Sequence, residues 1–349
     1  MKNVQRRVSS RRHRPTLQQY YKPGDKINEF HAHDDAVTSL AFDAPFGTLV
    51  TASTDNTVRV WDMNRYKCVG LLEGHLSTVK CMQMHDGLLV TGSQDASLKL
   101  WDLSKVGHTV DIGIDPSPLL QSFESHVDEI TTLSFNSDTL VSGSADKTIR
   151  QWDMTTGHCM QTIDVLWASS MMSSHIGSIA DFGSASSWQP RAPVSADYPF
   201  IGALQSFDAA LASGTSDGLV RLWDLRSGEV IRKLVGHTGP VTCLQFDDRN
   251  LTSGSADRSV RIWDLRTGGI LDSFAYDSPI QSLQFDASRI VCTVKQNVVK
   301  VYDRVEERHW DLGGGVEDPE STKTIGCARY EEGYLVEGGS DGSIGVWAI

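Results

Sequence analysis

The sequence lacks the long apolar runs, paired cysteines and nucleotide-binding motifs that mark several large classes of protein. No run of about 18 apolar residues occurs, so no segment is expected to insert into a membrane. The six cysteines are scattered and form no Cys-x-x-Cys pair, which argues against zinc and favours a reducing compartment. Neither a P-loop nor Gly-x-Gly-x-x-Gly is present. We therefore expect no cofactor, no bound metal and no catalytic residue.

Positive charge is concentrated at the N-terminus. Residues 1–26 carry eight Lys or Arg and one acid, whereas the whole chain has 32 basic and 44 acidic residues. The remainder therefore has a net charge near −19, from 24 basic and 43 acidic residues. Because phosphate binding needs clustered Lys and Arg, we expect no nucleic-acid ligand. Residues 1–23 are expected to form a disordered basic tail, with a mitochondrial presequence or phosphorylation at Ser9 or Ser10 as alternatives.

A Trp-Asp pair recurs along the chain at spacings of 39–71 residues, several of them near 40. Most copies follow a small-residue turn with an aspartate and an alternating apolar run, as in SGSADRSVRIWD, which is the pattern of two strands joined by a hairpin. A period near 40 with this pair is typical of four-stranded propeller blades, so the fold class is all-β. Seven copies predict a seven-bladed propeller, with pairs that start at Trp61, Trp101, Trp152, Trp223, Trp263, Tyr302 and Trp347.

The segment KINEFHAH (residues 26–33) has the pattern of an outer strand with no strands before it. We expect it to complete the last blade and close the ring, which removes the free sheet edges. The propeller domain would then span residues 24–349. A Ser-rich insert at about residues 165–199 interrupts it, either as a disordered loop or as a docking or phosphorylated loop.

These repeats resemble the WD-repeat family. The resemblance implies that His, Ser or Thr, Asp and Trp of one blade form a buried hydrogen-bonded tetrad. Because the same set recurs with Trp in four blades, a structural role is favoured over a hydrolase site. The complete tetrads are His33, Thr51, Asp55 and Trp61; His75, Thr91, Asp95 and Trp101; His126, Ser142, Asp146 and Trp152; and His237, Ser253, Asp257 and Trp263. The other three blades are expected to be less braced, because each keeps only part of the set. The fourth keeps Ser213, Asp217 and Trp223, the sixth Tyr302, and the seventh Asp341 and Trp347.

Residues 33–75 and 89–104, the Ser-rich insert and the degenerate VVKVYD run are also similar to the propeller of the fungal mitochondrial division protein 1 family. This resemblance implies an adaptor for mitochondrial, and often peroxisomal, fission at the cytosolic face of the outer membrane. In that family the propeller binds a dynamin-related GTPase, N-terminal helices bind a tail-anchored receptor and a coiled coil dimerises. No heptad run precedes Lys26, so receptor binding and dimerisation are not expected from this chain.

The partner is expected on the top face, which we define as the loops between strand d of one blade and strand a of the next, together with the b–c turns. Since binding hot spots are enriched in Arg, Arg258 is the first choice. An alternative function is substrate receptor of a ubiquitin ligase, although no F-box is visible; an assembly factor that binds nucleic acid would need a basic face. The predicted contact residues are Asp34, Asp35, Asp128, Glu129, Lys147, Arg258 and Asp277.

Overall fold

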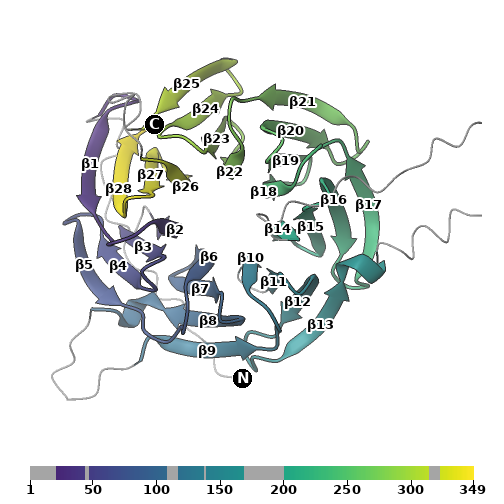
Figure 1. Cartoon of the computed structure of the whole chain (residues 1–349), viewed down its shortest axis with the longest axis horizontal. Coiled ribbons are helices and arrows are strands. Elements are labelled where there is room, and N and C mark those ends of the chain that lie inside the picture. Colours follow the sequence, from purple (N-terminus) through teal and green to yellow (C-terminus); the bar gives the residue numbers. More distant parts are fainter. Residues whose placement is uncertain (1–20, 44–46, 108–116, 137–138, 169–199, 314–322) are drawn as a thin grey trace, which may run out of the picture.

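The protein is a ring of seven four-stranded antiparallel sheets around one axis (Figure 1). The structure is a computed structural model that describes residues 21–43, 47–107, 117–136, 139–168, 200–313 and 323–349. Within each sheet the strands are ordered a to d from the central channel to the rim. The seven-bladed propeller predicted from the repeats is confirmed.

The first three blades are consecutive four-stranded meanders. Blade 2 also has a 3-10 turn, η2 (Leu103–Lys105), between its two outer strands. The strands of blades 1, 2 and 3 are β2 (Val37–Asp43), β3 (Thr48–Ser53), β4 (Val58–Asp62) and β5 (Lys67–Leu71); β6 (Val79–His85), β7 (Leu88–Ser93), β8 (Ser97–Asp102) and β9 (Leu119–Glu124); and β10 (Ile130–Phe135), β11 (Leu140–Ser144), β12 (Thr148–Trp152) and β13 (Cys159–Asp164).

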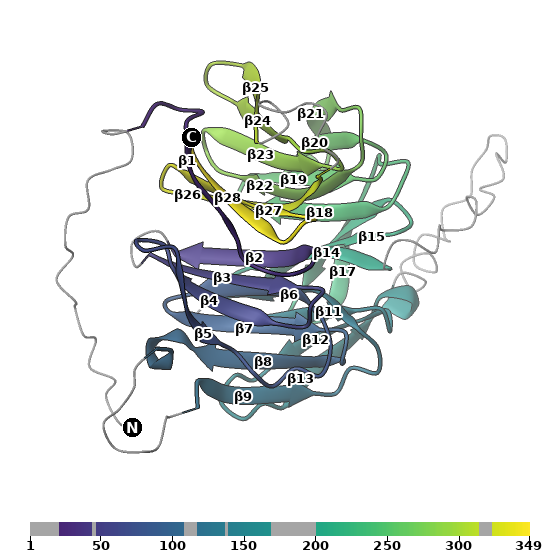
Figure 2. The ribbon, with the colours of Figure 1, turned by 60° about the vertical axis from the view of Figure 1, so that its left-hand side comes forward.

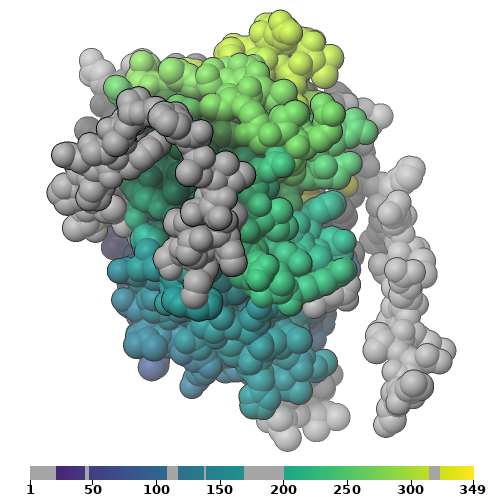
Figure 3. All heavy atoms as spheres, turned by 90° about the vertical axis from the view of Figure 1, so that its right-hand side faces the viewer, coloured from purple at the N-terminus to yellow at the C-terminus, as the bar shows by residue number. Residues whose placement is uncertain are grey.

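Blades 4 to 6 repeat the same meander after a helical turn at residues 165–168. Figure 3 shows the side of the ring on which blades 3 to 6 follow one another in chain order. Their strands are β14 (Ile201–Phe207), β15 (Ala210–Thr215), β16 (Leu219–Asp224) and β17 (Glu229–Val235); β18 (Val241–Phe246), β19 (Asn250–Ser255), β20 (Ser259–Asp264) and β21 (Ile270–Ala275); and β22 (Ile280–Phe285), β23 (Arg289–Val294), β24 (Val299–Asp303) and β25 (Arg308–Leu312).

Blade 7 joins the two ends of the described chain. Its inner strands are β26 (Ile325–Glu331), β27 (Tyr334–Gly339) and β28 (Ser343–Ala348), and its outer strand is β1 (Lys26–His31). β1 runs antiparallel to β28, with Lys26 opposite Trp347 and His31 opposite Ser343 (Figures 1 and 2). The prediction that the N-terminal strand closes the ring is confirmed.

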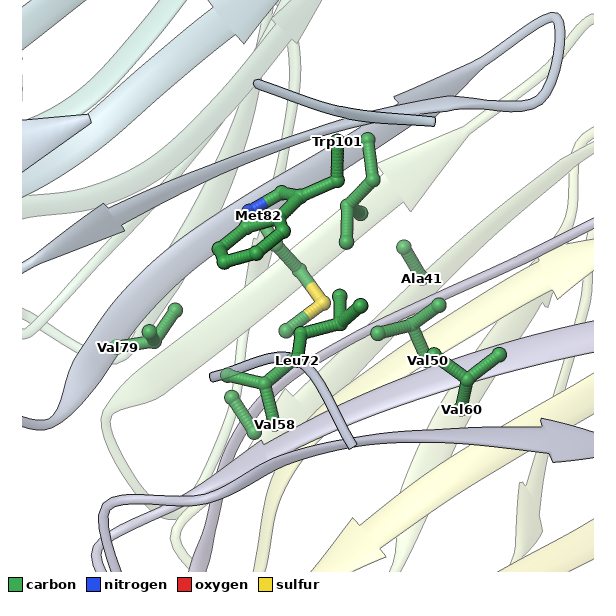
Figure 4. Packing of buried hydrophobic residues seen from close by; sticks show 10 residues of the cluster. Ala41, Val50, Val58, Val60, Leu72, Val79, Met82 and Trp101 are labelled. Atoms are coloured by element: carbon green, nitrogen blue, oxygen red, sulfur yellow. The ribbon is translucent and has the colours of Figure 1, made fainter. Parts of the chain in front are cut away.

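The core lies between blades, because each sheet packs its face against the next sheet. Figure 4 shows Val50 and Val60 of blade 1 on one side, with Met82 and Trp101 of blade 2 on the other. Trp101 is only 1% exposed. Burial of each such side chain contributes about 1.5–3 kcal/mol, so every blade depends on its neighbours.

Glutamines on the inner strands add polar links between blades. The Gln83 side-chain oxygen accepts a hydrogen bond from the Phe135 backbone N–H of the next blade at 2.8 Å. Gln245 of blade 5 and Gln284 of blade 6 each accept in the same way from a backbone N–H of the next blade, at 2.7 and 2.8 Å. The inner strands of all seven blades line a central cavity of 530 Å³. The ring is therefore a frame that presents its loops at two opposite faces.

Candidate functional site

Blade 2 shows how a tetrad is built. Trp101 Nε1 donates to Thr91 Oγ1 at 2.8 Å, Thr91 Oγ1 lies 2.7 Å from His75 Nε2, and His75 Nδ1 lies 3.0 Å from Asp95 Oδ2. An ionised carboxylate can only accept, so His75 Nδ1 donates to Asp95 Oδ2, while Trp101 Nε1 donates to Thr91 Oγ1 at the other end of the chain of contacts.

The same chain of contacts occurs in each blade for which a complete tetrad is predicted. Blade 3 uses a serine in place of the threonine, and blade 5 does the same, with no change in geometry. The distances for Trp to Ser/Thr, Ser/Thr to His and His to Asp are 2.9, 2.7 and 2.9 Å in blade 1 (Trp61, Thr51, His33, Asp55), 2.8, 2.8 and 2.8 Å in blade 3 (Trp152, Ser142, His126, Asp146), and 2.8, 2.8 and 2.9 Å in blade 5 (Trp263, Ser253, His237, Asp257).

Burial and hydrogen bonding set the charge of the tetrad. Burial acts to raise the pKa of the Asp146 carboxyl, but hydrogen bonds from Thr148 and His126 outweigh it and bring the pKa to about 2. Burial lowers the pKa of His126, and the nearby carboxylate offsets this only in part. At neutral pH, blade 3 therefore pairs a carboxylate with a neutral imidazole.

Each tetrad aspartate also fastens the top-face loops. In blade 2, Asp95 accepts from the backbone N–H of Ser97 at 2.9 Å and of Leu76 at 2.8 Å. Ser93, at the end of strand b, donates to the Ser77 carbonyl at 3.0 Å. The b–c turn and the d–a loop are thus bound to one another, which makes the top face of this blade rigid.

Blade 4 replaces the histidine with an arginine. Arg221 Nη2 lies 2.6 Å from Asp217 Oδ2, and the arginine side chain is almost wholly buried. Trp223 Nε1 still donates to Ser213 at 2.8 Å. Blade 4 was expected to be less braced because it lacks the tetrad histidine, and the structure adds that an Arg221–Asp217 ion pair stands in its place.

Blades 6 and 7 depart further from the tetrad pattern. In blade 6, Tyr302 stacks on His309 of the outer strand with ring centroids 4.4 Å apart. In blade 7, Glu337 occupies the place of the tetrad serine and is 2% exposed. Its carboxylate and the Trp347 indole both lie close to Gly345. A Cβ atom on residue 345 would come within 2.6 Å of Glu337 Oε1, so the glycine leaves room for the carboxylate. Burial raises the pKa of the Glu337 carboxyl to about 7.

All seven predicted contact residues lie in top-face loops and turns. Lys147 and Arg258 occupy equivalent positions in b–c turns, with φ of 68° and 69°. The Lys147 ammonium lies 5.8 Å from the centre of the Phe200 ring. The other five lie in d–a loops: Asp34, Asp35, Asp128, Glu129 and Asp277. Glu129 is half-buried, and the other six of the seven contact residues are exposed.

Three findings on the described residues concern metal binding, a nucleophile motif and membrane spans. No group of three or more His, Cys, Asp or Glu in the described part is placed to hold a metal ion. Residues 338–342 do have a Gly-x-Ser-x-Gly sequence, but they form the hairpin between β27 and β28 rather than a strand-to-helix elbow. No helix in the described ranges is long and apolar enough to cross a membrane.

Two exposed apolar side chains on the top face were not predicted. Leu76 is 91% exposed and Val127 is 85% exposed. Each directly follows a tetrad histidine, and this position could have signalled them, since the residue after that histidine lies at the tip of a d–a loop.

Comparison with known proteins agrees with this architecture. Residues 24–62, 66–102, 117–153 and 228–264 match the family described as WD domain, G-beta repeat. The chain is 50%, 49% and 50% identical to proteins named Mitochondrial division protein 1 from Coccidioides immitis, Aspergillus clavatus and Neurospora crassa, over 97%, 99% and 95% of its length. It spans 55%, 56% and 54% of those relatives. The chain is thus a WD-repeat β-propeller that shares about half of its residues with fungal mitochondrial division proteins.

Proposed function

We propose that this chain is the propeller of a mitochondrial and peroxisomal fission adaptor, which binds a dynamin-related GTPase and recruits it to the outer membrane. The observation that carries the proposal is the identity of 49–50% to proteins named for mitochondrial division over almost the whole propeller. The GTPase as partner follows from the family resemblance. The chain would act at the cytosolic face of the membrane, with a tail-anchored receptor bound through a part outside this chain.

The geometry supports a scaffold rather than an enzyme. Four of the seven blades tie their d–a loops to their b–c turns through tetrads, so the top face of these blades has a fixed shape before any partner arrives. A preorganised surface loses little conformational entropy on binding, which favours affinity. The tetrad His, Ser or Thr, and Asp side chains are engaged with one another inside the blades and are not arranged around a substrate cavity.

The test is a binding titration of the purified chain against a purified dynamin-related GTPase. Arg258→Glu should weaken binding about tenfold, the effect of losing one hot spot, without a change in melting temperature. Arg249→Glu is the matched control, because Arg249 lies in the same blade but in a bottom-face turn and is 85% exposed. The pair Asp128→Lys and Glu129→Lys should also weaken binding, and added salt should slow association.

A result in which the wild-type chain shows no affinity for the GTPase would reject the proposed partner. If Arg249→Glu abolished binding and Arg258→Glu did not, the top face would be the wrong face, although the adaptor role would stand.

A further inference from the structure

The two most exposed large apolar side chains on the top face occupy equivalent places in adjacent blades. Leu76 lies directly after His75 in the loop before blade 2, and Val127 lies directly after His126 in the loop before blade 3. Their exposed fractions are 91% and 85%. A single exposed apolar residue needs no explanation, but two in one register on neighbouring blades form a pattern.

The tetrads hold both side chains in place. The carboxylate of Asp95 accepts from the Leu76 backbone N–H at 2.8 Å, and that of Asp146 accepts from the Val127 N–H at 3.2 Å. The same carboxylates bind the tetrad histidines. Each loop tip is therefore fixed from inside the blade while its side chain projects into solvent.

A chain of polar side chains connects the two loops. Ser77, next to Leu76, donates to the Gln94 side-chain oxygen at 3.4 Å. The Gln94 amide in turn donates to Glu129 at 3.1 Å, in the loop that holds Val127. The two apolar side chains thus belong to one continuous surface across blades 2 and 3.

This surface is acidic. Between Ala32 and Asp146, the top-face loops and turns of blades 1 to 3 contain no Lys or Arg, and the first basic residue is Lys147. On the other side of the ring, Arg258 and Lys295 lie in the corresponding turns. Outside the tetrads, the acids in the top-face loops of blades 1 to 3 are Asp34, Asp35, Glu73, Asp128 and Glu129, and Glu124 is the last residue of β9, just before the loop that holds Val127.

We propose that Leu76 and Val127 are the apolar anchors of a docking site for a protein segment that carries apolar side chains flanked by Lys or Arg. The apolar pair supplies contact area, and the surrounding acids select a basic partner. An anionic membrane surface and nucleic acid are both disfavoured by the same acids. This inference deepens the proposed function and rests on it, because it names the part of the top face on which the partner docks.

The experiment compares the wild-type chain with the double variant Leu76→Ser and Val127→Ser. The matched control is Val305→Ser, since Val305 is 77% exposed and lies in a c–d turn on the bottom face. All three proteins should melt at the same temperature, because the substituted side chains are exposed. Affinity for a purified dynamin-related GTPase should fall at least about tenfold in the double variant and stay unchanged in the control.

A second probe separates this inference from the proposed function. A synthetic amphipathic peptide of leucine and lysine should bind the wild-type chain, lose affinity for the double variant and keep it for Val305→Ser. The same peptide with glutamate in place of lysine should not bind.

If the GTPase binds the double variant as tightly as the wild-type chain, the docking site is overturned while the adaptor function stands. If the wild-type chain does not bind the GTPase, the proposed function is overturned, and the two peptides then test the docking site by themselves. The docking site is rejected if the leucine–lysine peptide binds the wild-type chain and the double variant equally well, or binds neither.

Discussion

Blades 3 and 4 are neighbours in the ring but hold the same b–c turn in different ways. In blade 3, His126 reaches Asp146 from the loop before strand a, at 2.8 Å. In blade 4, Arg221 reaches Asp217 from strand c of the same blade, at 2.6 Å. The histidine fastens the d–a loop to the b–c turn, whereas the arginine links a strand only to its own turn.

This difference divides the top face into two kinds of loop. The loops before blades 1, 2, 3 and 5 are tied down by a tetrad, and those before blades 2 and 3 present Leu76 and Val127. The loop before blade 4 begins with the helical turn at residues 165–168, and the rest of the Ser-rich insert, residues 169–199, lies outside the described residues. A tetrad therefore stabilises its blade and also fixes the shape of one top-face loop.

The largest effect is expected in blade 4, where a charge is buried. Asp217→Ala leaves the Arg221 guanidinium buried without its carboxylate and should lower the free energy of unfolding by about 3–5 kcal/mol. Arg221→Met should cost much less, because the Asp217 side chain is 34% exposed and can be hydrated. Urea denaturation of the two variants measures this asymmetry, and equal losses would show that the pair is not the brace of blade 4.

A smaller effect is expected in blade 2. Asp95→Ala leaves the His75 Nδ1–H and the Leu76 N–H without their acceptor, at a cost of about 1–3 kcal/mol. Hydrogen exchange of the loop at residues 72–78 should speed up as well, an effect that no blade 4 variant should have on that loop. An unchanged melting temperature would contradict the structural role of the tetrads.

The smallest effect is a change in pH dependence at the closing blade. Burial raises the pKa of Glu337 to about 7 from an ordinary 4.5, so the folded state binds its proton more tightly than the unfolded chain. The stability contribution of this proton is complete below pH 4.5 and is lost as the pH rises through about 7. Glu337→Gln should flatten the dependence of melting temperature on pH between 5 and 8.

Asp341→Asn is the control in the same blade. Burial acts to raise the pKa of Asp341, but hydrogen bonds from Ser343 outweigh it and lower the pKa below its usual value. Its contribution is present above about pH 4 and is lost on acidification, so this variant should leave the slope between pH 5 and 8 unchanged. A wild-type slope in Glu337→Gln would mean that Glu337 is not the titrating group.

The repeat made the fold readable from the sequence. Each Trp-Asp pair marks one blade, and the unpaired strand at residues 26–33 indicated the closure that β1 and β28 make. The substitutes were not predictable in the same way. Arg221 stands where other blades also have Lys or Arg, and its pairing with Asp217 depends on the absence of a histidine contact in that blade. Glu337 in the serine position was visible, but its burial was not.

The partner-binding residues depend even more on three-dimensional structure. The sequence placed Arg258 and the acidic pair Asp128 and Glu129 in the predicted top-face loops and turns, but the exposed apolar side chains there were not singled out. Leu and Val usually lie in the core, and only the position of Leu76 and Val127 directly after a tetrad histidine indicates that they are exposed.

Docking on the top face can be measured by hydrogen exchange of the chain alone and in complex with a dynamin-related GTPase. The GTPase should slow exchange in the top-face loops at residues 72–78 and 124–129, while the bottom-face turns at residues 246–250 and 303–308 exchange as before. Slower exchange confined to the bottom-face turns, or no change anywhere at saturating GTPase, would contradict docking on the top face.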